Sequence, residues 1–135
     1  MNGGIPMLRS FVLVVLCSCG NGNIKIINET NHRADYNKII EMVYRLWPQA
    51  NTDLNIYLRP ESAEELSGIN GVFQYGLDKT DTVRVKYGGY ISTSYLAHEL
   101  IHWRCLHLYG DSDGEHETVD WYLVKAINEE FNDRE

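Results

Sequence analysis

The stretch that decides the fold runs from residue 92 to residue 110 and reads STSYLAHELIHWRCLHLYG. Ser92, like the Thr and Ser that follow it, can cap the free N–H groups at the start of a helix. Gly110 is a favourable residue just past a helix end, because glycine adopts a left-handed backbone without strain. These signals predict one helix that begins near Ser92 and ends near Tyr109.

This predicted helix contains His98-Glu99-Leu100-Ile101-His102, an H-E-x-x-H motif. A helix advances by about 100° per residue, so side chains four residues apart lie about 40° apart on one face. Two imidazoles placed in this way can bind one Zn²⁺ at about 2.0 to 2.1 Å. Glu99 is rotated by about 100° from His98 and can reach a water molecule beside the metal. We therefore expect His98 and His102 to be zinc ligands and Glu99 to be the general base.

A catalytic zinc site normally has a third protein ligand and one open position. His116 follows His102 by 14 residues, after a glycine-containing turn that can reverse the chain, and we expect it to be the third ligand. His107 lies about 180° around the helix from His98, and we interpret it as a surface histidine. Carboxylates compete with His116 for the third position, and the candidates are Asp111, Asp113, Glu115, Glu117 and Asp120.

The segment from His98 to Trp121 resembles the SprT-like (Spartan-type) zinc metallopeptidases and the wider group of gluzincin-like minimal zincins. In that family a third histidine follows H-E-x-x-H at a similar interval, after a polar loop with Asp and Gly, and an aromatic residue comes a few positions later. The resemblance covers roughly residues 82–123 and implies a zincin-like fold and peptidase activity. The chain departs from the family at Glu117, where glycine is usual, and it has no cysteine-rich zinc ribbon. It also has no basic DNA-binding segment, so the repair of DNA–protein crosslinks by some family members is not expected here.

The other segments predict an α+β fold. Apolar residues recur at helical spacing from Asp35 to Trp47, and Pro48 ends that helix. Strands are expected at residues 54–58, 72–75 and 82–87, and a last helix at 115–131. This order predicts an N-terminal helix, a small antiparallel sheet, the H-E-x-x-H helix and a C-terminal helix.

The N-terminus has the pattern of a secretory signal. The first 28 residues contain no acidic residue, and a short apolar run follows Arg9. The sequence Leu16-Cys17-Ser18-Cys19 resembles a bacterial lipoprotein box. This interpretation predicts a signal peptide at residues 1–18, a tether at 19–34 with a lipid anchor at Cys19, and a metallopeptidase-like domain at 35–135. The protein would then be lipid-anchored or secreted in the cell envelope; alternatively, residues 11–17 form a core strand of a cytoplasmic protein.

The composition limits the class of protein. A length of 135 residues suits one domain, and a net charge of −7 without a basic run argues against binding of nucleic acid through its phosphates. No apolar run reaches the roughly 18 to 20 residues of a membrane span. The net charge also favours substrates that are neutral or basic near the scissile bond.

Together these features predict a zinc-dependent metallopeptidase. Its peptide or protein substrate would pair with an open edge of the strand at residues 82–87. Asp120 is expected either to accept the second ring N–H of His116 or to be solvated. Two other functions stay open: a non-catalytic, zinc-stabilised lipoprotein that binds a partner at a membrane surface, and an interaction domain without metal. Donors that can stabilise the oxyanion are Tyr90, Tyr95, Arg104 and Tyr109.

Overall fold

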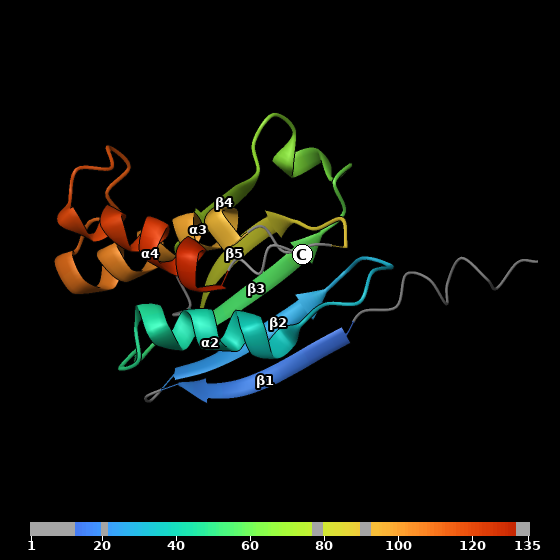
Figure 1. The fold of residues 1–135 in the computed structure, drawn as a ribbon, viewed down its shortest axis with the longest axis horizontal. Helices are drawn as coiled ribbons and strands as arrows, with labels where there is room; N and C mark the ends of the chain where they lie inside the picture. The colour runs from blue at the N-terminus through green and yellow to red at the C-terminus, as the bar shows by residue number, and fades with distance from the viewer. Residues whose placement is uncertain (1–12, 20–21, 77–79, 90–92, 132–135) are drawn as a thin grey trace, which may run out of the picture.

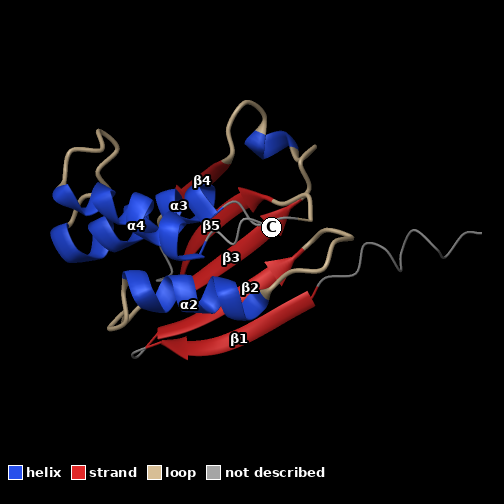
Figure 2. Cartoon of the chain, viewed as in Figure 1, coloured by secondary structure: helices blue, strands red, loops and turns tan. Residues whose placement is uncertain are grey.

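The computed structural model describes residues 13–19, 22–76, 80–89 and 93–131. Within these ranges, five strands form one mixed sheet in the order β1-β2-β3-β5-β4, and helices α2, α3 and α4 lie on one of its faces (Figures 1 and 2). The expected α+β class is confirmed. Among the described residues, no helix combines the length and the apolar character needed to cross a bilayer.

The centre of the sheet is parallel, which corrects the expectation of a small antiparallel sheet. β2 (Gly22–Asn28) and β3 (Asp53–Arg59) run parallel, and α2 (Tyr36–Leu46) connects them. β3 also runs parallel to β5 (Thr80–Lys86). Two parallel neighbouring strands need a crossover connection, and α2 is the crossover between β2 and β3. For the same reason α2 is not an N-terminal helix, as the sequence had suggested.

The two outer strands are antiparallel to their neighbours. β4 (Gly71–Gln74) pairs with β5 at one end of the sheet, and β1 (Leu13–Cys19) pairs with β2 at the other end. The short turn η1 (Glu64–Leu66) lies between β3 and β4 in the chain. Because β5 lies between β3 and β4, the expectation of an open edge at residues 82–87 is wrong. β4 has that position instead.

The segment expected to be a tether belongs to the sheet in its first half. Ile24 and Ile26 of β2 are buried in the core, because they are on the face that the helices cover. The strand of the alternative interpretation corresponds to β1, at residues 13–19. Residues 1–12 of the expected signal peptide lie outside the described ranges. Cleavage and lipidation at Cys19 stay a prediction.

The core lies between the sheet and the helices. The side chain of Asp35 caps α2 by accepting the Lys38 N–H at 3.1 Å, and the apolar side of α2 packs on the sheet. Full burial of a Leu or Ile side chain contributes about 1.5 to 3 kcal/mol, so this layer fixes the helices on the sheet. The core includes Ile24, Ile26, Ile39, Met42, Val43, Leu46, Leu54, Ile56, Leu58, Val83, Val85, Leu96, Ala97, Leu100, Ile101 and Trp103.

The last part of the chain has one expected helix and one shorter than expected. α3 (Thr93–Tyr109) matches the helix predicted around H-E-x-x-H. The C-terminal helix does not begin at residue 115, because a 3-10 turn, η2 (Val119–Trp121), precedes α4 (Tyr122–Phe131). Asp113 and His116 have φ angles of 64° and 60°, and such left-handed residues do not fit into a right-handed helix.

Candidate metal centre

Helix α3 brings His98 and His102 to one face, as their four-residue spacing predicts. Their ring centroids are 5.0 Å apart, and both side chains are half-buried. Leu100 and Ile101, which lie between them in the chain, are fully buried in the core. The helix cannot turn about its axis without exposing these apolar residues, so core packing fixes the direction of the two imidazoles.

The loop after Gly110 returns the chain to α3 and carries His116. Gly110 ends α3 with a φ of 77°, and its N–H donates to the Leu106 carbonyl at 2.9 Å. The N–H of His116 donates to the Asp113 carbonyl, also at 2.9 Å, and closes a turn. This turn directs the exposed His116 side chain toward α3, where its Nε2 lies 3.2 Å from Nε2 of His98. His116 holds a left-handed φ of 60°, which is strained for a residue with a Cβ and is often found at functional sites.

The three histidines have the geometry of a metal site. One ring nitrogen from each of His98, His102 and His116 lies within 4.8 Å of the others. The ring centroids are 4.9, 5.0 and 5.0 Å apart. Three imidazoles bound at about 2.1 Å to one tetrahedral ion have centroids about 5 Å apart, so the observed triangle fits a single ion. The structure therefore brings together all three histidines that the sequence predicted.

The surroundings of His98 and His102 favour neutral imidazoles, the form that binds metals. Burial lowers the pKa of His98, and the nearby His102 and His116 lower it further. Burial likewise lowers the pKa of His102. The Nδ1 of His102 lies 2.7 Å from the Ser112 carbonyl oxygen, which can only accept, so this nitrogen carries the proton. The Nε2 of His102 is then the metal-binding atom.

Glu99 lies beside this group without belonging to it. The residue is 8% exposed, and burial raises its pKa to about 7. A cation bound nearby would favour the carboxylate and lower that value. Gly71 of β4 is the neighbour that makes room for it: a Cβ added there would lie 3.1 Å from Cγ of Glu99. Sequence reasoning missed this contact, since nothing in the pattern around Gly71 marks it.

Asp113, expected as a competing ligand, instead organises the loop. Its carboxylate accepts the N–H groups of Glu117 and Thr118, both at 2.9 Å, and the indole N–H of Trp121 at 2.5 Å. Burial by itself would raise the pKa of Asp113, but these three donors outweigh burial and hold the pKa well below its usual range. Asp113 therefore stays ionised and joins the loop to η2.

The indole of Trp121 packs against all three imidazoles. Its ring centroid lies 4.9 Å from those of His98 and His102 and 4.5 Å from that of His116. Because Asp113 fixes the indole through its N–H, these two residues form one support for the histidines, which we call the Asp113–Trp121 clamp. Its members were visible in the sequence as a loop acid and a downstream aromatic residue, but their contact depends on the left-handed turns of the loop.

Asp120 is neither solvated nor a partner of His116, which corrects both expectations. It is buried, and its carboxylate accepts from Nε of Arg104 at 2.9 Å and from the hydroxyl of Tyr109 at 3.0 Å. These bonds also commit Arg104 and Tyr109, two of the four expected oxyanion donors, to a structural contact. Tyr95 is exposed in the first turns of α3.

The remaining candidates are placed as follows. Tyr90 lies outside the described residues. Asp111 accepts the Asp113 N–H at 2.7 Å, and Glu115 and Glu117 are exposed. Within the described residues, the only group of donors close enough to share an ion that involves this loop is the three histidines.

His107 is not the surface histidine that the helix geometry suggested. Its Nε2 lies 2.5 Å from Oδ2 of Asp81, and its ring stacks on Trp47 with centroids 5.6 Å apart. Asp81 is fully buried and also accepts the Gly76 N–H at 3.0 Å. His107 thus links α3 to β5, on a different side of the helix from His98.

The local geometry defines a candidate metal centre with a buried glutamate next to it. The resemblance to SprT-like peptidases rests on the H-E-x-x-H segment, His116 and Trp121, so the site itself must carry the functional argument. No protein-family model, curated protein or solved structure matches this chain.

Proposed function

We propose that this protein is a zinc-dependent metallopeptidase with a zincin-like arrangement of its H-E-x-x-H helix against an edge strand. The observation that carries the proposal is the convergence of His98, His102 and His116, with the buried Glu99 directly after His98 in the chain. A donor set of three imidazoles suits Zn²⁺. When bound, zinc supplies a Lewis acid that activates water at neutral pH.

Glu99 acts first as a general base and then as a general acid. Its carboxylate takes a proton from the attacking water while the water oxygen forms a bond to the carbonyl carbon of the substrate. The same proton passes to the amide nitrogen as the C–N bond breaks, so the leaving group departs as a neutral amine. Burial supports the second step, because it raises the pKa of this carboxyl group and so favours return of the proton, while a bound cation favours the carboxylate that the first step needs.

β4 offers an edge for an extended substrate. The N–H of Lys86 donates to the Asn70 carbonyl at 3.0 Å, so the even-numbered residues of this antiparallel pair bond to β5. The backbone groups of Gly71 and Phe73 therefore point away from β5, toward the outer side of the sheet. A peptide that adds there as a further strand brings its backbone close to Glu99, because Gly71 lies against that side chain.

The number of donors favours a catalytic site over a purely structural one. Structural zinc sites have four protein ligands, whereas the donor group among the described residues has three. A structural site also has no use for a buried carboxylate next to a ligand. The non-catalytic, zinc-stabilised alternative is therefore less well supported.

The test compares the wild-type protein with Glu99→Gln. We expect both to bind about one zinc per chain, and we expect the variant to lose about 10²- to 10⁴-fold in kcat, because it cannot transfer the proton. Metal analysis and mass spectrometry of digested casein measure the two effects. Glu115→Gln, which changes an exposed acid of the loop, is the matched control and should keep full activity. Wild-type rates in Glu99→Gln would reject the mechanism, and zinc-free protein after zinc addition would reject the metal centre.

A further inference from the structure

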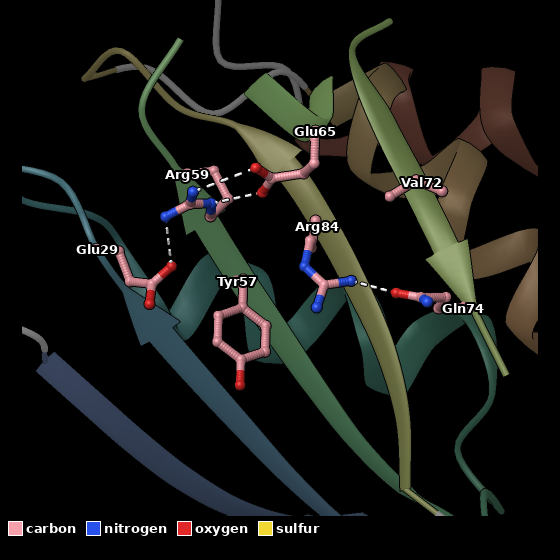
Figure 3. Close-up of a pocket in the computed structure, with 7 residues that line it drawn as sticks. All are labelled: Glu29, Tyr57, Arg59, Glu65, Val72, Gln74 and Arg84. Atoms are coloured by element: carbon pink, nitrogen blue, oxygen red, sulfur yellow. Dashed lines mark hydrogen bonds and ion pairs between the residues drawn. The ribbon is translucent and has the colours of Figure 1, made fainter. Parts of the chain in front are cut away.

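The sheet face opposite the helices carries a hollow of about 670 Å³. Figure 3 looks onto this face, with the helices behind the sheet, so the hollow and the metal centre lie on opposite sides of the sheet. β4 borders both: Val72 and Gln74 face the hollow, while Gly71 lies against Glu99. The residues that line the hollow and enter the argument are Glu29, Tyr57, Arg59, Glu65, Gln74 and Arg84.

The first arginine of the hollow is matched by carboxylates. Arg59 donates from Nη1 to Glu29 at 2.9 Å and from Nε and Nη2 to the two carboxylate oxygens of Glu65 at 2.7 and 3.2 Å. Both oxygens of Glu65 are thus occupied by Arg59. This network closes the end of the hollow near η1 (Figure 3).

Arg84, the second arginine of the hollow, binds a neutral side chain. Nη1 of Arg84 donates to Oε1 of Gln74, a neutral amide, and its guanidinium lies 5.5 Å from the ring centroid of Tyr57. Arg84 comes from β5, and the side chain of Gln74 extends from β4 across the hollow face to bind its guanidinium (Figure 3). Among the described residues, the hydrogen-bond partner of this half-buried guanidinium is a neutral amide, and Glu65 acts on it through its charge. The other N–H groups of Arg84 suit the two oxygens of a carboxylate.

Strand geometry connects this arginine to the proposed substrate. Side chains alternate between the two faces of a strand, and residues directly opposite each other share a face. A peptide added along β4 therefore places the side chain opposite Gly71 toward Glu99. The side chains opposite Val72 and Gln74 lie on the hollow face, where a long acidic side chain that crosses β4 beside Gln74 meets the guanidinium of Arg84.

We infer that Arg84 and Gln74 form a subsite for an acidic side chain of the substrate, an Asp or Glu one residue away from the position that faces Glu99. This inference rests on the proposed peptidase function and adds a substrate class to it. It also replaces the expectation, drawn from the net charge of −7, that substrates are neutral or basic. The charge that the substrate meets beside β4 is that of the local guanidinium, while the net charge describes the whole surface.

The experiment uses zinc-loaded protein and a tryptic digest of a whole-cell proteome, with cleaved bonds identified by mass spectrometry. Three variants are compared with the wild type: Arg84→Met, Arg84→Lys and Lys25→Met. Lys25 is exposed on the same sheet face but outside the hollow, so Lys25→Met removes the same charge without touching the subsite. Zinc content and thermal midpoint show that each variant is folded. A pair of synthetic peptides that differ only by Glu or Gln at the enriched position then gives the ratio of kcat/KM.

We expect Asp and Glu to be enriched at a position on the hollow side, and the wild type to prefer the Glu peptide by about tenfold, as for one charge-assisted hydrogen bond. The preference should disappear in Arg84→Met, weaken in Arg84→Lys and persist in Lys25→Met. Cleavage without an acidic preference, or with one that survives in Arg84→Met, overturns the subsite and leaves the peptidase function standing. No cleavage by the wild type overturns both.

Discussion

His98 and His102, in the first part of α3, present ring nitrogens to a third histidine, whereas His107 presents Nε2 to the buried carboxylate of Asp81. All three belong to one helix, and the difference lies in their direction around its axis. The first two face the loop that carries His116, and the last faces β5 and Trp47. A histidine on a predicted helix is therefore a candidate metal ligand only where other possible ligands lie close to it.

Glu99 of α3 and Asp120 of η2, which packs on the other end of α3, differ in the same way. Next to the histidines, burial alone raises the pKa of Glu99 to about 7. At the other end, Asp120 accepts from Arg104 and Tyr109, and these bonds tie α3 to η2. Asp120, which accepts hydrogen bonds, has a structural contact, whereas the buried Glu99 has the raised pKa that suits proton transfer.

The largest expected effect is the loss of metal in His116→Ala. With two donors left on α3, the site lacks a complete ligand set, and we expect less than about a tenth of the wild-type zinc content after dialysis. His107→Ala is the matched control, because it removes a histidine from the same region without touching the three donors. Metal analysis of both proteins measures the contrast. Equal zinc content in His116→Ala and the wild type would show that His116 is not a metal ligand and that the two parts of α3 do not differ as proposed.

The second prediction concerns the Asp113–Trp121 clamp. Asp113→Asn keeps the shape of the side chain but weakens its bonds to the three N–H donors, and we expect zinc affinity to fall by about 10- to 100-fold. Competition with a chelator of known affinity measures this. Glu115→Gln, at an exposed position of the same loop, should change the affinity little.

The clamp also predicts a pH dependence of stability. The folded state lowers the pKa of Asp113, so its contribution is present above the unfolded value of about 3.9 and is lost as the pH falls through that value toward the folded one. The stability difference between the wild type and Asp113→Asn should therefore narrow below about pH 4. Urea unfolding at several pH values measures it, and a constant difference would show that the charge of Asp113 is not involved.

The third prediction addresses the structural histidine. His107→Ala removes the closest hydrogen-bond partner of the buried Asp81 carboxylate, and we expect the free energy of unfolding to fall by about 1 to 3 kcal/mol. Adding Asp81→Asn should recover part of this loss, because no charge is then left buried. Denaturant unfolding of the zinc-loaded proteins measures both steps. A double variant no more stable than His107→Ala would argue against the contact between His107 and Asp81 as the cause.

The cluster of three histidines could be predicted from the sequence because its arrangement is mostly local. Helical spacing sets His98 and His102 on one face, and a glycine-containing turn brings His116 back after a fixed number of residues. The short distance between these elements leaves few alternatives. The same local patterns predicted α2, α3 and three strands of the sheet.

The features that the sequence did not predict depend on contacts between segments that are distant in the chain. The parallel centre of the sheet follows from β2, whose short apolar pattern also fits a tether, so the crossover through α2 was not visible. His107 meets Asp81 on β5, and Gly71 meets Glu99 across the layers. No periodic pattern encodes such pairs, because each partner is unremarkable in its own segment.

The fourth prediction tests the contact between β4 and the part of α3 that carries Glu99. In Gly71→Ala, the new Cβ would lie 3.0 Å from the Arg84 carbonyl oxygen and 3.1 Å from Cγ of Glu99, so β4 or Glu99 must shift by a few tenths of an ångström. We expect kcat/KM to fall by about tenfold while zinc content is unchanged. Gly114→Ala, which meets nothing within 4 Å, should behave as the wild type. Full activity in Gly71→Ala would show that the contact between β4 and Glu99 does not affect the reaction.

The smallest effect is expected from deletion of residues 1–18, which removes most of β1. β1 lies at the end of the sheet farthest from β4, and the described core begins at Ile24 of β2, which still pairs with β3 after the deletion. Both parts of α3 should keep their partners, so we expect unchanged zinc content and a thermal midpoint lower by only a few degrees. Differential scanning calorimetry and metal analysis measure these quantities. Loss of folding would make β1 an integral strand, and cleavage at Cys19 would then be incompatible with the folded metal centre.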